Sequence, residues 1–305
     1  MSSVKRNFSV RRPCKDAIML PDDSHSPIAV FDSGLGGLTV ARAIRQALPH
    51  ESIVYFGDTA RLPYGSKSAP TVLRFARQCL RFLMQLQPKL LVVACNTVSA
   101  TALETLADEF PVPVLGVLQP GARAAVTLAR SIAPGGPCRI GLIATEATIA
   151  SNAYPTAIAH MDHRVHVVGR PCPLLVPLIE EGRSADSPIV RAVLEDYLAS
   201  FTGLNITAMI LGCTHYPIFA SAIADVLGPR TQLVDAARQT ALEAHGVLDG
   251  LRQLRPPGKR GKFTCYVTDQ GLRFERLASL FLGHEIGQPT AVAAEMLEAA
   301  MVEQA

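Results

Sequence analysis

The segment LLVVACNT, at residues 90–97, decides the fold of this 305-residue chain. Its first five residues are apolar, and a thiol, an amide and a hydroxyl follow them directly. The segment MILGCTH, at residues 209–215, repeats this arrangement. Apolar runs without alternation are typical of strands that helices cover on both faces, as in parallel sheets. We therefore expect each segment to be a buried parallel strand that ends in polar side chains.

Similar short apolar runs recur along the chain and are separated by amphipathic stretches. The further predicted strands are residues 28–31, 53–56, 114–117, 140–143, 165–168, 232–234 and 263–267. The helical patterns include residues 38–48, 70–86, 98–109, 120–132, 188–201 and 218–227. This alternation predicts an α/β fold with doubly wound parallel sheets. The length favours two domains, and a hydrophobic content of 49% supplies their cores.

The two similar segments also predict where a ligand binds. In open α/β sheets, ligands bind beyond the carboxyl ends of the strands. Two similar domains facing each other at these ends would bring Cys95 and Cys213 across one cleft, although they are far apart in the sequence. We expect the active site in this cleft.

Composition excludes several other classes of protein. No apolar run reaches the roughly 18 residues that a membrane span needs, and the basic N-terminus lacks the apolar core of a secretory signal. We therefore expect a cytoplasmic protein without a membrane partner. In that compartment the seven cysteines are not expected to form a disulfide framework, and the absence of a Cys-x-x-Cys pair argues against structural zinc or thioredoxin-like chemistry.

Charge gives little sign of a nucleic-acid partner. The net charge is +3, and residues 1–26 contain five basic and three acidic side chains. A second basic run lies at residues 252–262, in a loop containing proline and glycine. Neither run is interleaved with aromatic residues, so we interpret both as solvated segments and predict no binding of nucleic acid.

Cys95 and Cys213 each lie where the next helix begins. The positive end of a helix dipole lowers the pKa of a thiol from about 8.5, so we expect a thiolate at these positions. His215 lies two residues after Cys213 and can tune its protonation. A lone cysteine of this kind is more often a buried apolar residue, but the repetition favours a functional pair.

Two further turns follow predicted strands. DSGLGG, at residues 32–37, fails the dinucleotide fingerprint because Thr39 stands at the third glycine position. Its backbone N–H groups can still bind a carboxylate or phosphate, or the segment is only a tight turn with a helix cap. The segment PYG, at residues 63–65, presents a phenol and a backbone N–H, or is an ordinary loop.

Two opposed thiols suit one particular reaction. Inverting a carbon stereocentre without a cofactor requires a base on one face and an acid on the other, and each positioned group contributes roughly 10²–10⁴-fold. Donors to the carboxylate of the developing carbanion are available from Ser33, Asn96, Thr97 and Thr214. The remaining cysteines are interpreted as structural or incidental; they are Cys14, Cys79, Cys138, Cys172 and Cys265.

Four of these motifs together resemble those of a known protein family. DSGLGG (32–37), PYG (63–65), CNT (95–97) and GCTHYP (212–217), in this order, resemble the glutamate racemases of the aspartate/glutamate racemase superfamily. The resemblance covers about residues 27–287 and includes LIATEAT (142–148) and YVTD (266–269). It implies interconversion of L- and D-glutamate with no cofactor and no metal, a supply of D-glutamate for peptidoglycan, and a homodimer.

The resemblance also implies roles for individual residues. Cys95 would take the proton from the D-isomer and Cys213 from the L-isomer, assisted by Asp32 and His215 respectively. Whether Glu146 or Glu180 also assists stays open. The implied substrate-binding residues are Asp32, Ser33, Tyr64, Gly65, Asn96, Thr97, Thr214 and His215.

The family fold implies that the chain returns to its first domain. We expect an extension at residues 1–26, a first domain at 27–120 plus 235–287, a second domain at 121–234, and a helical tail at 288–305. The extension suggests regulation by a UDP-muramoyl peptide precursor. Ala236 departs from the family pattern, which often has serine or proline there.

Three other functions remain as alternatives. The nearest is a racemase of the same superfamily that acts on aspartate or another small amino-acid or hydantoin substrate. The second is a non-catalytic amino-acid-binding protein on the same fold. The third is a metalloenzyme in which Cys95, Cys213 and His215 form a three-ligand zinc site.

Overall fold

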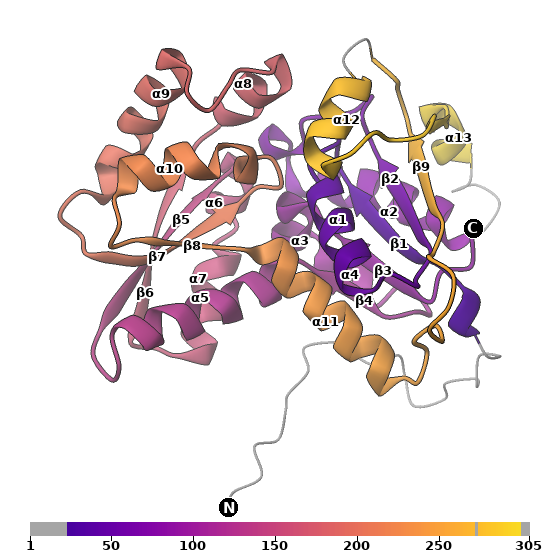
Figure 1. Ribbon diagram of the computed structural model, residues 1–305, viewed down its shortest axis with the longest axis horizontal. Helices are drawn as coiled ribbons and strands as arrows, with labels where there is room; N and C mark the ends of the chain where they lie inside the picture. The colour runs from indigo at the N-terminus through magenta and orange to yellow at the C-terminus, as the bar shows by residue number, and fades with distance from the viewer. Residues whose placement is uncertain (1–22, 272–273, 300–305) are drawn as a thin grey trace, which may run out of the picture.

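The computed structural model describes residues 23–271 and 274–299, in which the chain forms two separate parallel sheets (Figure 1). The six-stranded sheet has the order β10 (Thr290–Ala291), β9 (Phe263–Val267), β2 (Ile53–Gly57), β1 (Ile28–Asp32), β3 (Leu90–Val93) and β4 (Val114–Gly116). The four-stranded sheet has the order β6 (Val165–Pro171), β5 (Cys138–Ala144), β7 (Ile206–Gly212) and β8 (Gln232–Val234). The carboxyl ends of the strands therefore all lie at the same end of each sheet.

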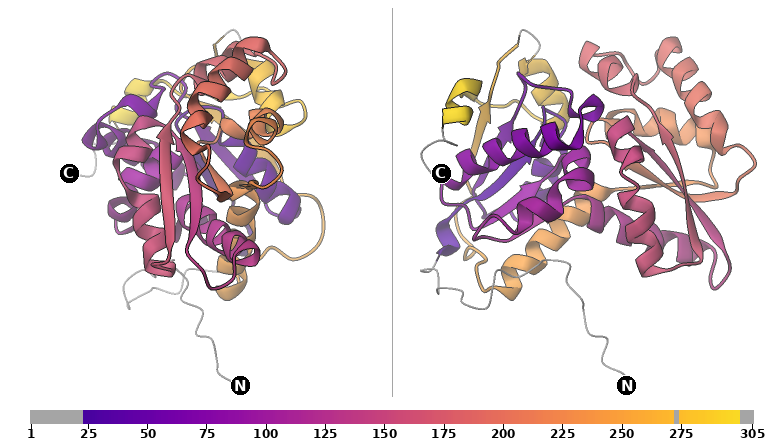
Figure 2. Two further views of the ribbon diagram at one scale, coloured as in Figure 1. Left: turned by 90° about the vertical axis from the view of Figure 1, so that its left-hand side faces the viewer. Right: turned by 180° about the vertical axis from the view of Figure 1, so that it is seen from behind.

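Helices connect successive strands and cover both faces of the sheets (Figure 2). The helices of the first half are η1 (Asp23–His25), α1 (Leu38–Ala47), η2 (Tyr64–Ser66), α2 (Ala69–Met84), α3 (Asn96–Thr101), α4 (Leu103–Ala107) and α5 (Leu118–Ile132). Those of the middle are α6 (Glu146–Ala150), α7 (Ala153–Met161), α8 (Leu175–Glu181), α9 (Pro188–Leu198), η3 (Ala199–Phe201), η4 (Tyr216–Phe219) and α10 (Ala220–Leu227). The last are α11 (Ala236–Gly250), α12 (Phe274–Leu282) and α13 (Ala294–Ala299).

The central strands are buried on both faces, as their continuous apolar runs predict. Val30 and Val92 belong to one apolar cluster, whereas the next residues, Phe31 and Val93, belong to another on the opposite face. Side chains alternate across a strand, so both faces of β1 and β3 are covered. The prediction of a doubly wound α/β fold is confirmed.

The chain crosses between the sheets twice. It leaves the first sheet after β4, through α5, and returns after β8 through α11, which packs against both α1 and α5. Strands of residues 28–116 and 263–291 form one sheet, and strands of residues 138–234 form the other. The finer domain boundaries stay a prediction.

All of the predicted strands occur, within a few residues of their expected ends. Two expectations about the remaining chain differ from the structure. The helical pattern at 98–109 is divided at Ala102 into α3 and α4, where φ is −137°. The expected helical tail begins with a short strand, β10, which pairs with β9 before α13 starts.

Two further points concern the chain ends and the membrane. Most of the predicted extension (residues 1–22) and the end of the predicted tail (residues 300–305) lie outside the described residues. Within the described part of the chain, none of the helices combines the length and apolar character required to cross a bilayer.

Candidate active site

The carboxyl ends of the two sheets meet around one small cavity of about 30 Å³. Cys95 follows β3 of the first sheet and Cys213 follows β7 of the second, and both thiols line this cavity. Its other lining residues are Ser33, Gly34, Leu62, Pro63, Tyr64, Gly65, Asn96, Thr97, Thr145, Val176, Glu180, Thr214 and His215. Every predicted site residue thus lines the cavity except Asp32. Asp32 lies behind the lining residues and bonds to two of them, Gly34 and Thr214.

Cys95 is buried and lies beside a hydroxyl group. Its Sγ donates to Oγ of Ser33 at 3.4 Å. Burial, together with the nearby carboxylate of Asp32, raises the pKa of Cys95 to about 12. The expectation of a thiolate at Cys95 is therefore wrong: the backbone N–H of Val98 in α3 lowers the pKa, but desolvation of the thiolate outweighs it.

Asp32 is fully buried at the end of β1 and receives hydrogen bonds from both parts of the site. Its Oδ2 accepts from the backbone N–H of Gly34 at 3.0 Å, and its Oδ1 accepts from the Thr214 hydroxyl at 3.4 Å. Burial raises the pKa of Asp32, while the charge of His215 opposes the rise. Asp32 therefore links the two motifs from beneath the cavity.

Two glycines of the DSGLGG turn permit this close assembly. A Cβ at Gly36 would lie 2.4 Å from Oγ1 of Thr214 and 2.6 Å from Nδ1 of His215. A Cβ at Gly37 would lie 2.4 Å from Cβ of Asp32. Gly36 is therefore required because the second motif packs directly on the turn, and Gly37 because the turn folds back on Asp32.

Cys213 has a very different neighbour from that of Cys95. Nδ1 of His215 lies 3.8 Å from Sγ of Cys213, and Nε2 of His215 lies 3.0 Å from Oε1 of Glu180. Burial lowers the pKa of His215, but the contacts with Cys213 and Glu180 outweigh burial and raise it to about 10. The imidazole is therefore protonated at neutral pH, and Phe281 packs edge-on against its ring, with the centroids 5.1 Å apart.

Of the two glutamates whose assistance the sequence left open, only Glu180 lies at the cavity. It extends from α8 to His215 and lines the cavity, whereas Glu146 is exposed at the start of α6 and does not line it. No local pattern connects Glu180 with the thiols, because 33 positions separate it from Cys213.

Thr145 is a second residue that motif reasoning did not single out. It follows β5, and its Oγ1 lies 3.0 Å from Oγ1 of Thr97 and 3.0 Å from Oγ1 of Thr148. A Cβ at Gly65 would lie 2.6 Å from Cβ of Thr145, so the PYG segment packs against it. Its place at the carboxyl end of a strand is the signal that could have identified it.

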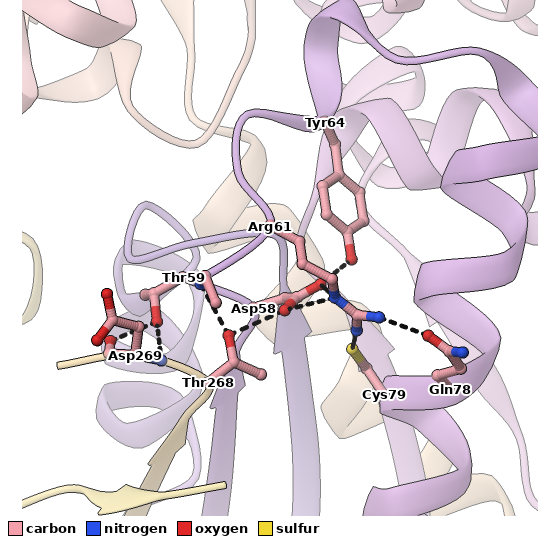
Figure 3. A network of polar contacts seen from close by, with 9 residues as sticks. Asp58, Thr59, Arg61, Tyr64, Gln78, Cys79, Thr268 and Asp269 are labelled. Carbon is pink, nitrogen blue, oxygen red and sulfur yellow. Dashed lines mark hydrogen bonds and ion pairs between the residues drawn. The ribbon is translucent and has the colours of Figure 1, made fainter. Parts of the chain in front are cut away.

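The phenol of Tyr64 is engaged in a network of polar contacts around Asp58 (Figure 3). Its hydroxyl donates to the buried carboxylate of Asp58, which also accepts from Nε of Arg61 at 2.8 Å and from the Thr268 hydroxyl at 2.9 Å. Burial raises the pKa of Tyr64 well above its usual value, with Cys79 and Asp58 adding to the rise, so the phenol stays protonated. Tyr64 thereby anchors the PYG segment inside the first domain.

A larger cavity of about 530 Å³ lies next to the site, between α1, α10 and α11. It shares Asn96, Cys213 and Thr214 with the small cavity. Ala236 lines only the larger cavity, so its departure from the family pattern does not alter the wall around the two thiols.

The chain was compared with known proteins and protein families. The model of the Asp/Glu/Hydantoin racemase family matches residues 38–244. Glutamate racemase of Chlorobaculum tepidum is 46% identical over 264 residues, which cover 86% of this chain and 94% of that protein. The chain belongs to the glutamate racemases of this family.

Solved glutamate racemase structures share the fold. That of the Francisella tularensis enzyme in complex with D-glutamate has a TM-score of 0.82 and 38% identity, covering 90% of this chain and 99% of that one. That of the Escherichia coli enzyme, with L-glutamate and the activator UDP-MurNAc-Ala, has a TM-score of 0.69 and 24% identity, covering 88% and 98%. The chain is therefore an amino-acid racemase, and the comparisons favour neither an aspartate enzyme nor a non-catalytic binding protein.

The zinc alternative finds no support in the geometry. Within the described ranges, no group of three or more His, Cys, Asp or Glu side chains is arranged to hold a metal ion. His215 is instead engaged with Glu180 and Cys213.

Proposed function

We propose that this racemase interconverts L- and D-glutamate by proton transfer between two cysteines, Cys95 and Cys213. One observation carries the proposal: thiols at the carboxyl ends of β3 and β7, in different sheets, line the same cavity. A substrate held there has one thiol available to each face of its α-carbon.

The two thiols would exchange roles in the two directions. With L-glutamate, the thiolate of Cys213 takes the α-proton, and the electron pair of the C–H bond is delocalised into the adjacent carboxylate. The S–H group of Cys95 then donates its proton to the opposite face, so that D-glutamate forms and Cys95 is left as the thiolate. With D-glutamate the same steps run in reverse.

The electrostatics of the site suit this starting state. The raised pKa of Cys95, about 12, keeps its proton in place as the acid. His215, whose pKa is raised to about 10, lies beside Cys213 and is placed to assist proton transfer at this sulfur.

Polar groups around the thiols would bind the substrate. We propose that Ser33, Asn96, Thr97 and Thr214, together with the backbone of Tyr64 and Gly65, hold its carboxylates and ammonium group, and that Thr145 joins them. A cavity of about 30 Å³ holds little more than a water or two. We therefore propose that the two sheets separate to admit glutamate and close on it.

The wider role follows the family. We propose that the enzyme acts in the cytoplasm as a homodimer and supplies D-glutamate for peptidoglycan, with domains divided near residues 120 and 234. A UDP-muramoyl peptide activator is proposed for the N-terminal side. Deleting residues 2–24 should reduce the response of activity to that precursor; an unchanged response would remove the proposal.

The experiment that tests the central proposal is α-hydrogen exchange in D₂O. The wild type should exchange the α-hydrogen of both glutamate isomers and racemise them, while leaving L-aspartate unchanged. Exchange into aspartate but not glutamate would refute the substrate. Full racemisation by the Cys95→Ala variant would refute the two-thiol mechanism.

A further inference from the structure

A buried hydrogen bond joins Asn96, beside Cys95 in the first domain, to Tyr154 in the second. Tyr154, on α7, donates from its hydroxyl to Oδ1 of Asn96 at 2.7 Å. The two residues are 0% and 5% exposed, so water does not compete for this bond. Asn96 begins α3 directly after Cys95 and lines the cavity that contains both thiols.

We propose that Tyr154 is a positioning residue, which orients the amide of Asn96 so that its N–H groups face a substrate carboxylate. The inference rests on the proposed substrate-binding role of Asn96. It adds a residue that belongs to none of the four motifs and lies in the opposite domain.

The chemistry of the two groups determines the orientation. An amide has a carbonyl that only accepts and an NH₂ group that only donates, and a carboxylate needs donors. Because the phenol donates to Oδ1, the carbonyl of Asn96 is turned toward α7, and both N–H groups of Nδ2 are left for another acceptor. A buried phenol is suited to this task, since burial raises the pKa of Tyr154 and keeps its proton in place.

The local backbone aims Tyr154 at its partner. Asn152, between α6 and α7, has φ of +56°, a left-handed conformation that asparagine tolerates better than most residues. The Ser151 hydroxyl accepts from the N–H of Ala153 at 3.3 Å, and α7 begins there. The Tyr154 hydroxyl also lies close to α5, where a Cβ on Gly121 would be 3.5 Å from it.

The neighbouring residue is held in the same manner. The Thr97 hydroxyl lies 3.0 Å from that of Thr145, which follows β5 in the second sheet. Cys95, by contrast, bonds to Ser33 within its own domain. Two of the three CNT side chains therefore take their orientation from the second domain, and the substrate-binding groups are fully arranged only when the domains meet.

The first test is the Tyr154→Phe variant, which retains the ring and removes only the hydroxyl. We expect KM for glutamate to rise about 3- to 10-fold, the value of one buried hydrogen bond, with kcat little changed. Tyr197→Phe is the matched control, since this tyrosine is also a buried residue of the same domain and its hydroxyl accepts from the N–H of Leu174. The control should retain the wild-type KM.

A double-mutant cycle separates positioning from mere packing. If Tyr154 acts through Asn96, the effect of Tyr154→Phe on KM should vanish in an Asn96→Ala background, because coupled residues are not additive. An equal effect in both backgrounds overturns the inference, as does a Tyr154→Phe variant with unchanged KM. An Asn96→Ala variant with unchanged KM would instead refute the substrate-binding role of Asn96, and the inference with it.

A second variant covers the case in which Tyr154→Phe does not fold. Asn96→Asp retains an acceptor for the Tyr154 hydroxyl but loses both N–H donors. We expect a raised KM with a melting temperature close to that of the wild type. A KM equal to that of the wild type would show that the N–H groups have no role and would overturn the inference.

Discussion

The two thiols of the active site occupy equivalent places in the two sheets, yet their surroundings differ. Cys95 is beside the neutral hydroxyl of Ser33, and its pKa is raised to about 12. Cys213 is beside His215, whose own pKa is raised to about 10 and whose far nitrogen is paired with Glu180. The same position on the fold thus places one thiol beside a neutral hydroxyl and the other beside an imidazole that is paired with a carboxylate.

The difference shows that the neighbours of a thiol can outweigh its place at a helix N-terminus. At Cys95, desolvation and the charge of Asp32 raise the pKa more than the N-terminus of the short helix α3 lowers it. In the proposed mechanism, the two thiols therefore work from unequal surroundings.

The strongest test of this comparison is removal of either thiol. Cys95→Ala and Cys213→Ala should each lower the rate of racemisation by roughly 10²–10⁴-fold or more, since each removes a general acid or base. Cys95→Ala should still exchange the α-hydrogen of L-glutamate in D₂O, because Cys213 can remove and return a proton. The matched control is Cys265→Ala, a buried cysteine on β9, which should racemise at nearly the wild-type rate.

The next test concerns the two assisting groups. His215→Gln should lower kcat/KM on the order of 10²-fold, and equally in both directions, because L- and D-glutamate have equal free energies. The asymmetry should appear in the α-deuterium isotope effect, measured with each labelled isomer. This effect should increase for L-glutamate in His215→Gln and for D-glutamate in Asp32→Asn; the reverse pattern would contradict the assignment of the two sides.

A smaller effect is expected from Glu180→Gln. The contacts with Cys213 and Glu180 raise the pKa of His215, so loss of the carboxylate should lower it. His215 is protonated below its pKa, and activity that depends on this charge is lost as pH rises through about 10 in the wild type. The alkaline limb of kcat/KM should therefore move to lower pH in the variant, as measured between pH 6 and 11; an unmoved limb would separate Glu180 from catalysis.

The smallest effect is expected from Ser33→Ala. Its hydroxyl carries no charge, so its loss from the Cys95 side should cost only about 3- to 10-fold in kcat/KM, the value of one neutral hydrogen bond. Ser131→Ala provides a control, because that exposed hydroxyl bonds only to the carbonyl of Leu128. If Ser33→Ala lowered kcat/KM as much as His215→Gln does, the two thiols would not differ in how strongly they depend on their neighbours.

Some of the site could be predicted from short segments, and some could not. The four motifs placed their residues around one cavity because each follows the carboxyl end of a strand. Glu180 was left open and Thr145 was not singled out, since each lies outside these motifs. The strand β10 was missed because two residues, Thr290 and Ala291, form no pattern by themselves.

The sequence by itself determined the alternation of strands and helices, the two-sheet architecture and the placing of Cys95 and Cys213 at the ends of two strands. These features depend on hydrophobic burial and on local patterns, which neighbouring residues encode. Only the tertiary structure decided the raised pKa of Cys95, where the Tyr64 phenol donates and which side chain bonds to the amide of Asn96. Such properties depend on burial and on short distances between groups that are remote in sequence, because desolvation and charge act through space rather than along the chain.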